Sequence, residues 1–261
     1  MALAAWGLVA TLAAAAGPGA QLAIVIDDLG YDPGAARRVA ALAGPLTAGI
    51  LPDTPASRTT ATLARAAGHE VLVHLPMQSR EPHELGRIAL TLGQDELTVT
   101  RSLDDALTAV PGARGLSNHM GSALTADTGA MRTLMLSLHM RGALYFLDSR
   151  TDPGSVAERT ACEYGVPFVR RDVFLDHDPD PAAIAAALAH AAGLARTRGH
   201  AVAIGHPYPA TLAVLEARLP ELTGAGVTLV PVSALVTDPA EVDPWPTCSS
   251  RSPPVAKKSR P

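Results

Sequence analysis

The chain has 261 residues, of which 48% are apolar and only 3% aromatic, and its formal net charge is −4. This length and apolar content suit one large globular domain with a substantial core. Acidic and basic residues are interspersed, and no basic face is present to hold a phosphate backbone, so we expect no nucleic acid partner. The two cysteines, Cys162 and Cys248, show no zinc-binding spacing, and we expect both to be free thiols.

The N-terminal segment resembles the apolar region of a secretion signal. Residues 2–16 are apolar except for Thr11, and three alanines precede Gly17 as a candidate cleavage site. The segment is shorter than a typical membrane span. We therefore expect residues 1–20 to be an export leader with weak membrane association, and the protein to be periplasmic or extracellular. A leader helix retained on a cytoplasmic protein is the alternative.

The rest of the chain alternates between strand and helix patterns. Short apolar runs predict strands, at 22–26, 46–51, 70–75, 115–117, 143–147, 167–169, 201–204 and 227–230. Helical patterns separate them, at 35–42, 56–67, 94–110, 127–141, 155–165, 181–198 and 209–219. Alternation of this kind indicates an α/β fold with a parallel sheet. We predict a (β/α) barrel of seven or eight parallel strands over residues 21–237. Residues 238–261, rich in Pro, Ser and Lys, are predicted to be a disordered tail.

The first predicted strand ends in two adjacent carboxylates. Residues 22–26 are all apolar, and Asp27 and Asp28 follow at once. Neighbouring carboxylates repel each other unless a proton or a cation lies between them. In parallel α/β folds the C-terminal ends of the strands carry the ligand sites. The pattern indicates a metal ligand and a base side by side, or else Asp27 ends the strand and Asp28 caps a turn.

Polar residues also follow several of the other predicted strands. The whole set is Asp27, Asp28, His74, Asn118, His119, Asp148, Arg171, Asp172 and His206. Each has a structural alternative, such as a hydrogen-bonded core histidine, a turn cap or an ion pair. In a parallel barrel, however, all of them converge on one face. Together they supply the ligands, carboxylate, imidazole and arginine that metal-assisted hydrolysis requires.

Six motifs occur in the order found in a known family. They are IVIDDLGYD, GHEVLVHLPMQ, GLSNHMGSALTAD, LYFLDSRT, RRDVFLD and AIGHPYPAT. Over about residues 22–235 the chain resembles the divergent polysaccharide deacetylase family, a distant branch of the carbohydrate-esterase type deacetylases. The resemblance implies a (β/α) barrel related to glycoside hydrolases.

The resemblance also implies a role for each matching residue. Asp27 matches the base, and Asp28 matches a metal ligand. His74 matches the first histidine of a His-x-x-x-His pair, but Gln78 stands at the second position, and His119 is the natural replacement. The metal implied is zinc or another divalent transition metal.

Three further residues, Asp148, Arg171 and Asp172, resemble those that orient and tune the base, and His206 resembles the general acid. The implied reaction is removal of acetyl groups from an N-acetylated envelope glycan. A non-catalytic barrel that binds glycan or protein stays open as an alternative. So does a glycoside hydrolase, which would use Asp27 with Asp148 or Asp172 as its carboxylate pair.

Overall fold

The computed structural model describes residues 19–239. Its strands are β1 (Ala20–Leu29), β2 (Thr47–Ile50), β3 (Glu70–Met77), β4 (Gly115–Met120), β5 (Tyr145–Asp148), β6 (Phe168–Arg170), β7 (Val173–Phe174), β8 (His200–Gly205) and β9 (Val227–Leu229). Its helices are α1 (Pro33–Ala40), α2 (Ser57–Ala66), α3 (Glu96–Ala109), α4 (Thr128–His139), α5 (Ala157–Glu163), α6 (Pro181–Arg198) and α7 (Pro209–Gly224), and a short 3₁₀ helix covers Val232–Ala234.

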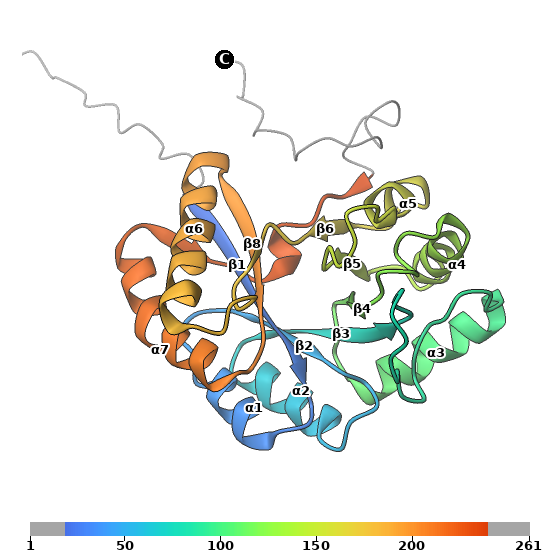
Figure 1. The fold of residues 1–261 in the computed structure, drawn as a ribbon, viewed down its shortest axis with the longest axis horizontal. Helices are drawn as coiled ribbons and strands as arrows, with labels where there is room; N and C mark the ends of the chain where they lie inside the picture. The colour runs from blue at the N-terminus through green and yellow to red at the C-terminus, as the bar shows by residue number, and fades with distance from the viewer. Residues whose placement is uncertain (1–18, 240–261) are drawn as a thin grey trace, which may run out of the picture.

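The strands form one sheet, in the order β6-β5-β4-β3-β2-β1-β8-β7, and β9 pairs with the first residues of β1. All of these pairings are parallel. Figure 1 shows the strands curling around a common centre, with the helices on the outer side. The predicted (β/α) barrel is therefore confirmed.

The barrel closes through the chain itself rather than through a ladder between its edge strands. The edge strands β6 and β7 are consecutive in sequence, and only Arg171 and Asp172 separate them. The backbone N–H of Arg171 donates to the carbonyl of Asp148 on β5, at 3.0 Å, and that of Asp172 donates to Val202 on β8, at 2.9 Å. One short segment thus joins the two ends of the sheet.

The two faces of the sheet bury different side chains, as the two-residue period of a strand requires. The outer face packs against the helices and forms the larger apolar cluster. The inner face carries a small cluster in the barrel interior, which includes Ala23, Val25, Leu72, Leu147, Val202 and Ile204. Inward-facing positions near the C-terminal strand ends continue this alternation and place polar side chains at one mouth of the barrel.

Most of the predicted elements are present, and their ends differ by a few residues. The two-residue strand β7 was not predicted. Most of the predicted leader (1–18) and of the tail (240–261) lies outside the described residues, so both stay predictions. Within residues 19–239 no helix is long and apolar enough to cross a membrane. The expectation of a free thiol is wrong for Cys162, which is disulfide-bonded.

Candidate active site

A bulge in β1 lets two consecutive carboxylates face the same site. Between Ile26 and Leu29 three steps along β1 match only two steps along β2, from Ala48 to Ile50. The extra residue re-aims the side chains that follow, which is the usual effect of a bulge beside a functional site. Asp28 takes a φ of 59°, in the left-handed region. The alternative of Asp28 as a turn cap is not supported, because its carboxylate faces His74 and His119.

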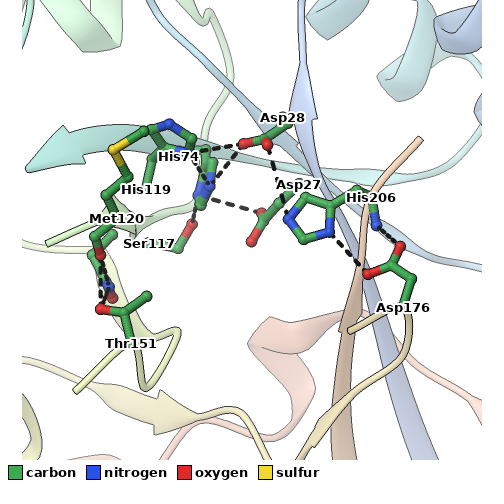
Figure 2. Close-up of polar contacts among 10 residues, drawn as sticks. Asp27, Asp28, His74, Ser117, His119, Met120, Thr151, Asp176 and His206 are labelled. Atoms are coloured by element: carbon green, nitrogen blue, oxygen red, sulfur yellow. Dashed lines mark hydrogen bonds and ion pairs between the residues drawn. The ribbon is translucent and has the colours of Figure 1, made fainter. Parts of the chain in front are cut away.

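Strand alternation brings three histidines to the two carboxylates. On the inner face of β1 the series Ala23 and Val25 continues to Asp27, and on β3 Leu72 is followed two residues on by His74. By the same period Ile204 on β8 is followed by His206. Ser117 on β4 pairs with His74, and His119 stands two residues further along β4. Figure 2 shows Asp28 between the His74–His119 pair and His206.

Three of these side chains form a compact set of ligand atoms. Asp28 Oδ1 lies 3.3 Å from His74 Nε2 and 2.9 Å from His119 Nδ1. The two imidazole nitrogens are themselves 3.2 Å apart. Ligand atoms held 2.0–2.2 Å from one tetrahedral zinc ion lie about 3.4 Å apart. The three ligand atoms are therefore close enough to share one such ion.

The environment of Asp28 also fits a cation. Its Oδ1 is buried against the two imidazole nitrogens, and a buried carboxylate oxygen is costly unless a positive charge compensates it. Burial alone raises the pKa of Asp28, but the imidazoles of His119 and His74 outweigh this effect and hold the pKa well below its usual range. A permanently ionised carboxylate with two imidazoles is a donor set that suits zinc.

The ring of His74 is oriented by a residue that the sequence analysis did not identify. Its Nδ1 lies 2.7 Å from the hydroxyl of Ser117, which stands directly opposite on β4. With Nδ1 engaged there, Nε2 is directed toward Asp28. Metal-binding histidines commonly have such a second contact, which fixes the ring and its tautomer.

Asp27 lies beside the ligand triangle but is not part of it. The residue is only 1% exposed, and its Oδ1 lies 3.4 Å from His74 Nδ1 and accepts no hydrogen bond. Burial raises the pKa of Asp27, although the charge of His74 acts in the opposite direction. A buried carboxylate with a raised pKa is suited to accept and release protons.

On the other side of Asp28, His206 is held by a carboxylate of its own. Asp176 accepts from the backbone N–H of His206 at 2.6 Å, and its Oδ1 lies 2.9 Å from His206 Nδ1. Thr211 donates a further hydrogen bond to Asp176. His206 Nε2 then lies 3.8 Å from Asp28 Oδ2. Burial alone lowers the pKa of His206, but Asp176 outweighs it and the net pKa is raised.

Asp176 was also missed from the sequence, although it ends the RRDVFLD motif. The residue chosen in that motif, Asp172, contacts other groups. Its carboxylate accepts the backbone N–H of Val202 at 2.9 Å and lies 3.7 Å from Arg198. Asp176, rather than Asp172, is therefore the carboxylate of this segment that orients His206.

Asp148 and Arg171 border the cluster without joining it. Asp148 directly follows the inward-facing Leu147, so the alternation of the strand places it on the other face of the sheet. Its Oδ1 accepts the backbone N–H of Arg150. Burial raises the pKa of Asp148. Arg171 donates to the carbonyls of Ser149 and Arg150, at 2.7 and 3.0 Å. Burial lowers the pKa of Arg171, while the charges of Asp148 and Asp27 oppose that shift.

The departures from the His-x-x-x-His pattern have a structural explanation. Gln78 stands where the second histidine would be, and its side-chain oxygen accepts the backbone N–H of Leu92 at 2.9 Å. Gln78 thus fixes the loop after β3 instead of facing the ligand triangle. Asn118 likewise links strand ends, because its oxygen accepts the backbone N–H of Ser149 and its nitrogen donates to the carbonyl of Met120.

Fold and site together define a class: a parallel (β/α) barrel with a candidate metal centre at the C-terminal ends of its strands. The sequence profile of the divergent polysaccharide deacetylases matches residues 24–236. The chain is 41% identical over 221 residues to the uncharacterized protein YibQ of Escherichia coli K12, which covers 84% of this chain and 68% of that protein. The protein belongs to the divergent polysaccharide deacetylase family.

Solved structures show the same architecture. An uncharacterized protein from Agrobacterium tumefaciens C58 is 25% identical, with a TM-score of 0.80 over 84% of this chain and 90% of that chain. A family 4 carbohydrate esterase from Streptomyces lividans, solved with acetate, is 17% identical, with a TM-score of 0.51 over 87% of this chain and 96% of that one. The latter likeness establishes the fold alone.

Proposed function

We propose that this protein is a metal-dependent hydrolase that removes acetyl groups from an N-acetylated envelope glycan. The observation that carries the proposal is the grouping of three different chemical functions within one cluster. Asp28, His74 and His119 form the ligand triangle, Asp27 lies beside it as a buried carboxylate, and His206 is held by its own acid partner.

Each function has a place in amide hydrolysis. A divalent transition metal in the triangle would polarise the acetyl carbonyl and lower the pKa of the attacking water. Asp27 takes the proton of that water, because its raised pKa and its free Oδ1 suit a base. His206, whose pKa is raised by Asp176, gives a proton to the departing nitrogen. General acid–base help of this kind contributes roughly 10²- to 10⁴-fold to the rate.

The surroundings of His206 support a sugar as the substrate. The ring of Tyr208 stacks on His206, with centroids 5.4 Å apart, and Tyr208 is 50% exposed. In a deacetylation the departing nitrogen is attached to the sugar, so the sugar ring lies next to the general acid. The free face of Tyr208 offers an apolar surface there for the C–H face of a pyranose ring.

The contacts of Asp148 and Asp172 give less support to the alternative of a glycoside hydrolase. A glycosidase needs two carboxyl groups on either side of one glycosidic bond. Asp148 is directed toward the backbone of Arg150, and Asp172 toward Arg198 and Val202. The non-catalytic alternative would use the same cluster to bind a glycan without turnover.

Acetate release tests the proposal against the non-catalytic barrel. The zinc-supplemented protein is incubated with N-acetylglucosamine oligosaccharides and with peptidoglycan fragments, and free acetate is measured. We expect release that stops on chelation and returns when zinc is added back. Retention of these glycans with no acetate from any of them would establish a binding protein instead.

We also propose that the protein acts outside the cytoplasm, exported by its leader. The support is the apolar run at residues 2–16 followed by the candidate cleavage site. N-terminal sequencing of the protein from its native host tests this. We expect a mature chain that begins near residue 17 in the envelope fraction, whereas an intact Met1 in the cytosolic fraction would contradict export.

A further inference from the structure

A hollow of about 440 Å³ lies where the chain joins the two ends of the sheet. Its lining residues come from the loop after β5, from the β6–β7 segment and from the end of α6, and they are Arg150, Pro153, Arg170, Arg171, Asp172 and Arg198. The volume falls within the range of small-molecule sites. Four of the six lining residues are arginines, although the formal net charge of the whole chain is −4.

The acids near the hollow do not balance these arginines. A single oxygen of Glu158 serves both Arg150, at 3.8 Å, and Arg170, at 3.4 Å. Asp172 lies 3.7 Å from Arg198, which is longer than a hydrogen bond, and its other oxygen is used by a backbone N–H. Arg150 and Arg171 also interact with the charge of Asp148, so the four positive groups face three carboxylates, which leaves a formal excess of one positive charge.

One of the four arginines is also held in place. Arg171 is fixed by two carbonyl hydrogen bonds, and its guanidinium lies 5.0 Å from the ring centroid of Phe174. Fixed guanidinium groups bind phosphate with paired N–H donors and lose little entropy on binding. Arg198, with a side chain 59% exposed, leaves its charge open to a ligand that enters from solvent.

We propose that this hollow, which we call the arginine hollow, binds a phosphate monoester group. The excess of positive charge favours an anion, and the four arginines converge from three segments of the chain, as a tetrahedral group with several oxygens requires. The site is separate from the ligand triangle and does not depend on the proposed hydrolysis. It borders that site through Arg171, so an occupied hollow would hold a phosphorylated ligand beside the barrel mouth.

The experiment measures binding of inorganic phosphate and of glucose 6-phosphate to the zinc-supplemented full chain by titration calorimetry, with glucose as the uncharged comparison. The test variants are Arg198→Glu and the milder pair Arg170→Gln with Arg198→Gln. The control is Arg218→Glu. Like Arg198, Arg218 is exposed and lies beside one acid, Glu221, but it does not line the hollow. We expect both phosphates to bind and the test variants to weaken them at least about tenfold, with no change in the control.

The two probes separate the sources of the phosphate. Equal affinity for both indicates a site for the free anion, and tighter glucose 6-phosphate indicates a phosphoryl group on a larger molecule; each supports the proposal. Phosphate can also bind a metal, so Asp28→Asn is titrated in parallel. Binding that is lost in Asp28→Asn but kept in the Arg198 variants would overturn the proposal, as would the absence of binding in the wild type.

Discussion

Gly49 on β2 leaves the space in which the carboxylate of Asp27 on β1 lies. A Cβ built at residue 49 would overlap with Asp27 Oδ1, and it would come within 3.2 Å of the Asp27 Cα. The backbone at position 49 therefore sets how deeply the proposed base is buried. Glycine is needed at position 49 because a side chain would collide with Asp27. The backbone does not require it, because φ at Gly49 is not in the left-handed region.

Replacing Gly49 by alanine should displace Asp27. We expect Gly49→Ala to lower stability by about 1–3 kcal/mol, because the added methyl group meets backbone as well as side chain. Acetate release should fall by roughly 10²-fold, since small misplacements of catalytic groups are costly. Gly193→Ala is the matched control: Gly193 lies within α6, and a Cβ there meets nothing within 4 Å. Thermal unfolding and acetate release are measured for both, and equal losses in the two variants would contradict this role for Gly49.

Ser117 should matter for metal affinity through the ring of His74. Removing its hydroxyl in Ser117→Ala leaves His74 Nδ1 without its 2.7 Å partner. We expect the affinity for zinc to fall about 10- to 100-fold, the usual effect of losing such an orienting contact. Ser137→Ala is the control, because Ser137 is also buried but its hydroxyl faces Thr100. Competition with a zinc chelator measures the affinity, and an unchanged value in Ser117→Ala would remove Ser117 from the site.

Asp176 should set the alkaline limit of activity. A general acid must be protonated, so activity falls as the pH rises through the pKa of His206. Asp176 raises that pKa, and Asp176→Asn should therefore move the alkaline limb of the pH–rate profile to lower pH. Asp178→Asn serves as the control, because Asp178 is exposed and its carboxylate accepts the backbone N–H of Asp180. An unshifted alkaline limb in Asp176→Asn would show that His206 is not the acid.

Much of the fold followed from the sequence because its signal is local. Apolar runs such as 22–26 and 201–204 are buried strands, and each helix pattern between them is present. In the segment that closes the barrel, the strand predicted at 167–169 is β6, but β7 was missed, since it has only two residues and depends on pairing with β8. Such short strands carry no periodicity of their own.

The candidate site, like the fold, was predicted only in part from the sequence. The family resemblance indicated the ligand set among the polar residues near the strand ends, and the structure brings Asp28, His74 and His119 together. The orienting residues could not, because they are fixed by pairing and contact across the barrel. Ser117 is defined by its register with His74, and Asp176 stands two residues beyond a strand too short to detect.

The most direct test of the account compares Asp27→Asn with Asp28→Asn. Metal content per chain and acetate release from N-acetylglucosamine oligosaccharides are measured on the same preparations. We expect Asp27→Asn to keep the metal and lose roughly 10²- to 10⁴-fold in rate, because it removes the base alone. Asp28→Asn should lose both the metal and the activity, because it removes a ligand. Acetate release at the wild-type rate by Asp27→Asn, with metal still bound, would contradict the account.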